Sequence, residues 1–182
     1  MRDHIVETAG RLFYQHGVKT VGVDRIIAEA GIAKATLYRH FPSKEQLVVA
    51  YLHARHDAVM QSMEQGRLGA QAGACARVLR YFEILQRKAD SPEFKGCAFL
   101  LALAEHEDSA PIKEVVLRHK QAILETFLAE LPEGLAGRLP LARQLALLYD
   151  GALAQIMVQR SPEAAQIAAL CADSLLQAQL GR

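Results

Sequence analysis

The segment KATLYRHF, near the N-terminus, places chemically different side chains on opposite sides of a predicted short helix. At about 100° of rotation per residue, Leu37 and Phe41 point to one side, where an apolar core would hold them. The opposite side carries Ala35, Thr36 and Arg39. In the major groove of DNA, a small residue can touch a thymine methyl, a hydroxyl can bond a base edge, and a guanidinium can fork onto guanine or grip a phosphate. The spacing is therefore typical of a helix that lies in the major groove.

Polar side chains flank this face. Tyr38 and His40 lie on its two shoulders, where they could reach the phosphates that form the groove walls. Lys44 follows at the start of the next predicted helix, where its charge and the free N–H groups of that helix favour one more phosphate. These positions predict contacts that fix a helix on the DNA backbone without reading its sequence.

Three short helices would hold this face in place. Apolar residues at helical spacing predict helices over Arg2–His16, Val23–Ala30 and Lys34–Phe41, and Gly31 lies in the tight connection between the second and the third. Pro42 ends the third helix. This order is a helix-turn-helix pattern, although three amphipathic helices with a glycine turn also occur in many other all-α proteins.

The rest of the chain is predicted to be helical throughout. Ser43 is a good N-cap for a long helix over Lys44–Gln65. Five further helices follow, at about Ala72–Ala89, Ala98–His106, Pro111–Leu131, Leu139–Gln159 and Pro162–Leu180. Because alanine and leucine dominate and β-formers are sparse, we expect an all-α fold of about nine helices. The predicted domains are a helix-turn-helix head at residues 1–46 and a helical body at residues 47–182.

The composition excludes several classes of protein. With 51% apolar and 23% charged residues among 182, the chain is not of the disordered class. Its three widely spaced cysteines form neither a CxxC pair nor an even set, so neither a structural zinc site nor a secreted disulfide scaffold is indicated. Residues 1–20 contain no apolar signal-peptide core, and the longest aliphatic and aromatic run is Ala98–Ala104. We therefore expect no membrane span and a cytoplasmic location.

Charge is unevenly distributed along the chain. The net charge is +1, yet residues 1–56 hold eight Lys or Arg and five Asp or Glu, a net of +3. Five of the seven histidines also lie in this part. A mildly basic N-terminal part joined to a mildly acidic remainder favours a phosphate-facing end, although this distribution does not establish it alone.

The stretch from Ala9 to Leu47 resembles the DNA-binding domain of the TetR family of bacterial transcriptional regulators. The matching positions, in the order and spacing of the family, are Leu12, Phe13, Gly17, Ile26, Ala30, Gly31, Thr36, Leu37, Tyr38, His40, Phe41, Ser43, Lys44, Glu45 and Leu47. The helical body resembles the family more loosely. One departure is Gly22-Val23 at the start of the second helix, where many members carry hydroxyl residues. This departure suggests fewer phosphate contacts, not a lost function.

The resemblance implies a ligand-responsive regulator that does not act as an enzyme. By the usual mode of the family it would be a repressor that binds a pseudo-palindromic double-stranded DNA operator as a homodimer. Within the recognition helix and the next helix start, it implies base contacts from Lys34, Ala35, Thr36 and Arg39 and phosphate contacts from Tyr38, His40 and Lys44. The last two helices, at about residues 139–180, would form the dimer interface. Their composition alone is equally consistent with a cover for the core of one monomer.

The resemblance also implies a small-molecule pocket enclosed by the middle helices, whose ligand would release DNA. Candidate lining residues are bulky or polar side chains of these helices: Tyr81, Phe82, Phe99, Leu103, His106, Phe127, Tyr149 and Met157. Plain core packing is an alternative for each of them. Because few of them are polar, we expect a small, mostly apolar effector.

Three other functions leave weaker signals. Cys97 follows Gly96 at a predicted helix start, which favours a thiolate and makes a redox- or electrophile-sensing regulator an alternative, while a buried thiol without a role explains it as well. His53, His56 and Asp57 lie close on one helix, but solvated side chains explain them, and we expect no metal or other cofactor. An all-α small-molecule enzyme is the remote alternative, because no known catalytic motif and no converging catalytic residues are found.

Overall fold

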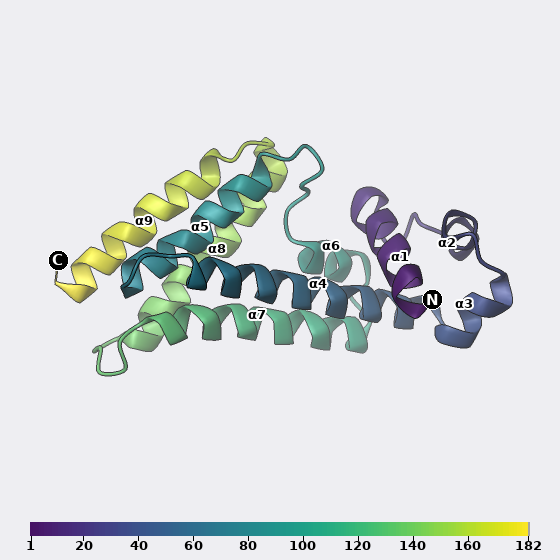
Figure 1. The fold of residues 1–182 in the computed structure, drawn as a ribbon, viewed down its shortest axis with the longest axis horizontal. Coiled ribbons are helices and arrows are strands. Elements are labelled where there is room, and N and C mark those ends of the chain that lie inside the picture. The colour runs from purple at the N-terminus through teal and green to yellow at the C-terminus, as the bar shows by residue number, and fades with distance from the viewer. Residues whose placement is uncertain (182) are drawn as a thin grey trace. The chain divides into compact units, whose positions relative to one another are not determined.

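The computed structural model describes residues 1–181, and the regular structure in this part of the chain is entirely helical (Figure 1). Its helices are α1 (Arg2–His16), α2 (Val23–Ala30), α3 (Lys34–His40), α4 (Lys44–Leu68), α5 (Ala74–Ala89), α6 (Ala98–Glu105), α7 (Ala110–Glu130), α8 (Arg138–Gln159) and α9 (Glu163–Leu180). The predicted all-α fold of about nine helices is confirmed. Arg182, the last residue of the predicted body, lies outside the described residues. None of the helices described is long and apolar enough to cross a membrane.

The third helix is one residue shorter than predicted. The sequence predicts a helix that includes Phe41, but α3 ends at His40 and Phe41 adopts extended backbone angles, φ −137° and ψ 95°. The reason is Pro42, whose ring clashes with a helical residue before it. The side chain of Phe41 is still buried, as predicted.

The fourth helix is longer than predicted. The sequence predicts its end near Gln65, because Gly66 and Gly69 follow, but α4 continues to Leu68. Gly66 is buried inside the helix, and a Cβ atom built there would overlap Cδ1 of Ile84 on α5. The glycine therefore serves a close helix approach, and it does not end the helix.

The residues group into two compact units. Met1–Ala58 pack with Ala98–His119, and Val59–Cys97 pack with residues 120–181. Helices α4 and α7 each contribute residues to both units. The predicted division after residue 46 ends with the helix-turn-helix, whereas the first unit also takes in the following part of α4, α6 and the start of α7.

The first unit is organised around the apolar stripe of α1. This stripe consists of Ile5, Val6, Ala9, Leu12 and Phe13, all of them buried. The ring of Phe13 meets the ring of Tyr51 on α4 at a centroid distance of 5.8 Å. Gly10 makes room for this ring, since a Cβ atom there would lie 2.7 Å from Cδ2 of Tyr51. The helix-turn-helix is thus packed directly against the first turns of α4.

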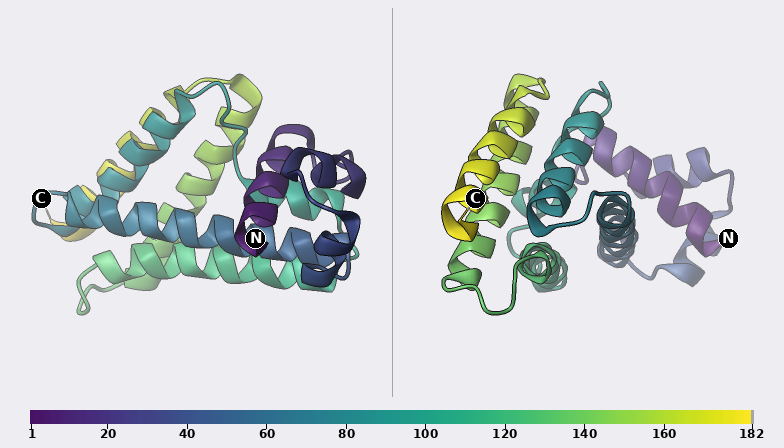
Figure 2. Two further views of the ribbon diagram at one scale, coloured as in Figure 1. Left: turned by 45° about the vertical axis from the view of Figure 1, so that its right-hand side comes forward. Right: turned by 60° about the vertical axis from the view of Figure 1, so that its left-hand side comes forward.

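In the second unit, α5 and α8 both pack along α9, as Figures 1 and 2 show. The inner face of α9 is lined by buried alanines, which allow close approach of the neighbouring helices: Ala164, Ala165, Ala168 and Ala172. An aromatic cluster fills the interior beside them. Its members are Tyr81 and Phe82 on α5, Phe127 on α7 and Tyr149 on α8, with ring centroids 5.6–5.9 Å apart.

A buried carboxylate ties α7 to α5 in this unit. Glu130 is only 5% exposed, and it accepts a hydrogen bond of 2.7 Å from the hydroxyl of Tyr81. The guanidinium of Arg77, one turn before Tyr81, pairs with the other carboxylate oxygen. Burial, and then the bond to this carboxylate, raise the pKa of Tyr81 above its usual value. Glu130 is therefore satisfied on both oxygens, as a buried charge must be.

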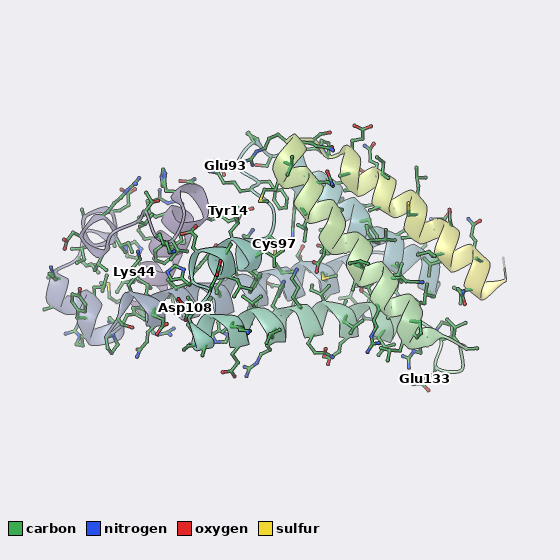
Figure 3. The ribbon with its side chains drawn as sticks, turned by 180° about the vertical axis from the view of Figure 1, so that it is seen from behind. Tyr14, Lys44, Glu93, Cys97, Asp108 and Glu133 are labelled. Carbon is green, nitrogen blue, oxygen red and sulfur yellow. The ribbon has the colours of Figure 1, made fainter. Side chains whose placement is uncertain are left out.

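The substitution Glu130→Ala tests this arrangement. It leaves the Tyr81 hydroxyl and the half-buried Arg77 without their acceptor, so we expect the free energy of unfolding to fall by about 2 kcal/mol. The measurement is urea denaturation followed by circular dichroism. The control is Glu133→Ala, in the exposed α7–α8 connection (Figure 3), where a change below about 0.5 kcal/mol is expected. Equal losses in the two variants would contradict a role for the buried carboxylate.

Candidate nucleic-acid interface

Polar side chains connect α1 with α2. Three contacts connect the two helices: His4 Nε2 to the carbonyl oxygen of Ala30 at 3.1 Å, Arg11 to Glu29 at 2.8 Å, and Arg25 to His16 Nε2 at 3.0 Å. The Arg11 guanidinium holds the pKa of the Glu29 carboxyl below its usual value. Arg11 and Arg25 belong to the basic N-terminal part that was predicted to face phosphate, but these contacts of theirs are within the protein.

The turn between α2 and α3 depends on Gly31. Its backbone is left-handed, with φ 63° and ψ 35°, and the amide of Ile32 donates to the carbonyl oxygen of Ile27 to close the end of α2. Nothing lies within 4 Å of a Cβ atom built at this position. The glycine is therefore required by backbone conformation and not by lack of space.

Helix α3 has one buried and one exposed side. Leu37 and the following Phe41 are buried, whereas Ala35, Tyr38 and Arg39 are exposed. Tyr38, a large aromatic residue, is 42% exposed. In the same helix, Thr36 and His40 are half-buried at the edges of the exposed side. The structure thus brings the predicted DNA-contacting residues of α3 onto one accessible surface.

The two predicted lysine contacts are already engaged within the protein. Lys34 is exposed and lies 3.2 Å from the carboxylate of Asp24, an exposed pair that can open at little cost. Lys44, labelled in Figure 3, is half-buried and donates a long 3.5 Å hydrogen bond to the carbonyl oxygen of Lys19. Burial lowers the pKa of Lys44, and the nearby Glu105 carboxylate opposes this shift.

The start of α4 has the predicted cap. The hydroxyl oxygen of Ser43 accepts a hydrogen bond of 3.2 Å from the amide of Gln46, three residues later. Ser43 thus satisfies one of the free amides at the N-terminus of α4. The other free amides keep the partial positive charge that attracts an anion.

A carboxylate of α6 fixes the loop between α1 and α2. The sequence does not reveal this contact. Glu105 accepts a hydrogen bond of 2.5 Å from the amide of Lys19. Its oxygen would also lie 2.9 Å from a Cβ atom at Gly17, whose φ is 86°. A second bond, of 2.6 Å, joins Ser109 to Glu45 on α4. No local pattern connects positions 86 apart in the chain, so only the fold could show this contact.

Comparisons with known proteins agree with this geometry. Residues 5–51 match the model of the bacterial regulatory proteins of the tetR family. Rv1255c, an HTH-type transcriptional regulator of Mycobacterium tuberculosis, is 45% identical over 51 residues, which cover 28% of this chain and 25% of that relative. The Escherichia coli repressor NemR is 24% identical over 89% of this chain and 86% of its own length.

Solved structures extend the likeness over the whole chain. SCO4454, a TetR-family transcriptional regulator from Streptomyces coelicolor, is 35% identical with a TM-score of 0.87, over 98% of this chain and 95% of that one. The chain belongs to the TetR family of transcriptional regulators. The structure of reduced NemR, at 23% identity, a TM-score of 0.85 and 94% coverage of both chains, shares the same fold. The predicted family and the coarse function of a DNA-binding regulator are thereby established.

The pocket residues predicted for this TetR-family chain are divided between the two compact units. Four of them, Tyr81, Phe82, Phe127 and Tyr149, are the aromatic cluster of the second unit and contact one another. Burial raises the pKa of Tyr149 above its usual value.

The remaining predicted pocket residues lie elsewhere. Phe99, in the first unit, stacks on His119 with centroids 3.6 Å apart and planes within 8°. Leu103 and His106 are half-buried in and just after α6, where His106 Nδ1 donates to the carbonyl oxygen of Ala102 at 3.2 Å. Met157 packs against Gly96 in the second unit. Core contacts thus account for most of these residues, and the pocket stays a prediction.

Cys97 and His56 have partners that the sequence does not indicate. Cys97, labelled in Figure 3 just before α6, is buried, and the Lys120 ammonium lies 3.7 Å from its sulfur and 2.5 Å from the Asp150 carboxylate. His56 Nδ1 lies 3.1 Å from Nδ1 of His119. Within residues 1–181, no group of three or more His, Cys, Asp or Glu side chains is arranged to hold a metal ion. Thiol sensing through Cys97 stays a prediction.

Substitution of Gly31 tests the turn that presents α3. Gly31→Ala places a Cβ atom on a left-handed residue, so we expect a loss of about 1 kcal/mol in the free energy of unfolding of the first unit. The matched control is Gly22→Ser at the start of α2, where φ is −76° and a hydroxyl can cap the helix. Hydrogen exchange of the α2 and α3 amides measures both effects. Similar exchange in Gly31→Ala and the unchanged protein would show that the turn does not need glycine.

Proposed function

We propose that the chain is a ligand-responsive repressor that binds a pseudo-palindromic operator as a homodimer. Membership of the TetR family makes it a DNA-binding regulator, and the relative NemR is a repressor by name. The observation that carries the proposal is the two-sided helix α3. Its apolar side is buried, and its other side exposes a methyl, an aromatic hydroxyl and a guanidinium.

The exposed side of α3 supplies the proposed DNA contacts. Ala35 is small enough to let the helix approach a thymine methyl, and Thr36 can bond a base edge. Arg39, which is exposed on this side of the helix, would fork onto a guanine or grip a phosphate. Lys34 would contribute once it leaves Asp24, because an exposed ion pair is worth at most about 1 kcal/mol.

Phosphate contacts are proposed for three residues around this helix. Tyr38 and His40 lie beside the exposed face, and Lys44 lies at the start of α4. The free amides at the start of α4 support the same contact. Gly22 offers no hydroxyl at the start of α2, which is consistent with few phosphate contacts there.

Exposed apolar stripes on α8 and α9 support dimerisation through these helices. On α8, four exposed residues without charge follow each other at spacings of four, three and four: Leu147, Gly151, Ala154 and Val158. On α9, the exposed residues Ile167, Leu170, Cys171 and Ser174 form a similar stripe. Leu147 is 74% exposed and Leu170 is 70% exposed in the single chain. A second copy of the chain would cover both stripes, and burial of this surface is the driving force.

The effector is proposed to be small and mostly apolar, and to act by changing the spacing of the two heads. It must bind the DNA-incompetent arrangement better than the competent one, because equal affinity shifts nothing. The Glu105–Lys19 contact supports a route to the head within the first unit, since it joins α6 to the loop before α2.

The DNA function is tested by selecting binding sites from random duplex DNA with the purified protein at a stated salt concentration. We expect enrichment of a two-fold-symmetric site, with half-sites about one helical turn or more apart. Tyr38→Ala should weaken binding to all sequences alike, because phosphate contacts carry no base information. Arg39→Ala should relax the preference at one position and cost about 1–3 kcal/mol if it reads a base. If it grips a phosphate, affinity falls and the selected sequence is unchanged.

The control for this selection is Arg118→Gln, which removes an exposed guanidinium of α7, far from α3 in sequence. It should leave the selected site and its affinity unchanged. Binding that is insensitive to both Tyr38→Ala and Arg39→Ala would show that α3 is not the recognition helix.

The dimer is tested by Leu147→Glu combined with Leu170→Glu. A carboxylate on each stripe would have to be buried against the second copy, so we expect a monomer at micromolar concentration and loss of cooperative operator binding. Size-exclusion chromatography with light scattering measures the mass. The matched control is Leu117→Glu on α7, also an exposed leucine, at 60% exposure. A dimer that persists in the double variant would exclude α8 and α9 as the interface.

A further inference from the structure

A groove of about 620 Å³ lies between α1 and the N-terminal part of α4, entirely within the first unit. All of its lining residues belong to these two helices. They recur at spacings of three and four along each helix, so each wall is a single helix face. Hollows of this size are typical of small-molecule sites, which combine an apolar surface with a few polar groups.

Small and apolar residues form one part of the groove lining. Ala50, Ala54 and Ala58 follow each other at spacings of four on α4, and α1 contributes Val6 and Gly10. Val6, Gly10 and Ala50 are buried, whereas Ala54 and Ala58 are exposed. The groove therefore presents apolar surface to solvent, and an apolar ligand would gain free energy by covering it.

Two of the arginines in the lining have partners outside the groove. Arg11 pairs with the Glu29 carboxylate on α2 at 2.8 Å. The guanidinium of Arg2 lies 5.0 Å from the centre of the Phe41 ring. Neither Glu29 nor Phe41 lines the groove. These two cations therefore have a counterpart in the protein and need none from a ligand.

The third arginine has a partner within the lining. The guanidinium of Arg55 on α4 lies 4.8 Å from the centre of the ring of Tyr14, which Figure 3 labels on α1. A cation is attracted to the face of an aromatic ring because the ring carries negative charge density there. Arg55 is half-buried in this position. All three arginines of the groove are thus engaged with other protein groups.

The carboxylates of the lining are not engaged in this way. They are Asp3 and Glu7, four residues apart on α1, and Asp57 on α4. All three are exposed, and none forms a hydrogen bond or an ion pair with any residue that the structure describes. The charges of the groove that remain available are therefore negative.

The helix dipole explains one of these carboxylates but not the other two. Asp3 lies in the first turn of α1, where the free amides favour a negative charge. Glu7 lies in the second turn of α1, and Asp57 lies in the middle of α4. Each of these two carboxylates is next in sequence to an apolar lining residue, Val6 or Ala58. Both walls therefore combine apolar surface with an available negative charge.

We propose that this groove binds a small molecule that combines an apolar body with one ammonium group. The apolar body covers the alanines of α4 and Val6 of α1, and the ammonium group lies beside Glu7 or Asp57. Burial of the body supplies the affinity, and the carboxylates supply the preference for a cation. The site shares no residue with the proposed DNA contacts or with the predicted pocket, so it does not depend on the proposed function.

Fluorescence titration of the full-length protein without DNA tests the proposal, with pyrenylmethylammonium as the probe. Pyrenylmethanol and pyrenylacetate are the matched probes, because they keep the apolar body and replace the cation by a neutral or a negative group. We expect saturable binding of the cation, one per chain, and weaker binding of the neutral probe. The anion should bind at least about tenfold more weakly than the cation, because it meets the available carboxylates.

Variants of the groove separate a site from general attraction. Ala54→Leu fills the groove and should abolish binding of the cation, whereas Ala28→Leu, at an exposed alanine of α2 outside the lining, should not change it. Glu7→Gln combined with Asp57→Asn should weaken binding of the cation about fivefold and leave the neutral probe unchanged. Glu133→Gln removes an exposed carboxylate outside the groove and should change neither. Circular dichroism and thermal melting confirm that each variant is folded.

Three results would overturn the proposal. They are equal affinity for the three probes, retained binding of the cation in Ala54→Leu, and equal weakening by Glu133→Gln and by the double variant. Site selection from random DNA with the unchanged protein is the separate measure of operator binding. A selected site without binding of the cation would reject the groove alone and would leave the proposed DNA-binding function intact.

Discussion

The burial of Leu37 and Phe41 is the constraint on which the proposed DNA-binding surface depends. Helix α3 has only 7 residues, too few to be stable alone, so its helical form requires tertiary packing. Those two side chains fix which side faces the core, and the left-handed turn at Gly31 fixes where the helix begins. The exposed position of Arg39 is a consequence of both. A helix held by one apolar side can vary its other side freely, which allows one fold to serve many operator sequences.

Local patterns were sufficient to predict this part of the fold, because its signals are short in sequence. The apolar spacing of α1, the glycine of the turn, the proline after Phe41 and the Ser43 cap each act within a few residues. The contact of Glu105 with Lys19 has no such signal. Periodicity also tells that Tyr81 and Phe99 are buried, but not which neighbours surround them. The residues of the proposed pocket are therefore the hardest to predict, since they must be brought together by tertiary structure.

Overall charge is a poor guide to which cations can meet phosphate. The basic N-terminal part keeps several of its charges engaged within the protein, as Arg11 is with Glu29 and Lys34 is with Asp24. What matters is whether each charge already has a partner, and this depends on helix faces that are brought together by packing.

The size of the contacts within the first unit limits how a ligand could act on the head. Two exposed hydrogen bonds, from Lys19 to Glu105 and from Ser109 to Glu45, join α6 and the start of α7 to the helix-turn-helix and α4. At about 1 kcal/mol each, they could carry about 2 kcal/mol per chain and about 4 kcal/mol in a dimer. An equilibrium shift of that size is on the order of a thousandfold, which is enough for the proposed release of an operator. The proposed regulation therefore needs no large rearrangement, only a ligand whose affinity depends on whether these two bonds are made.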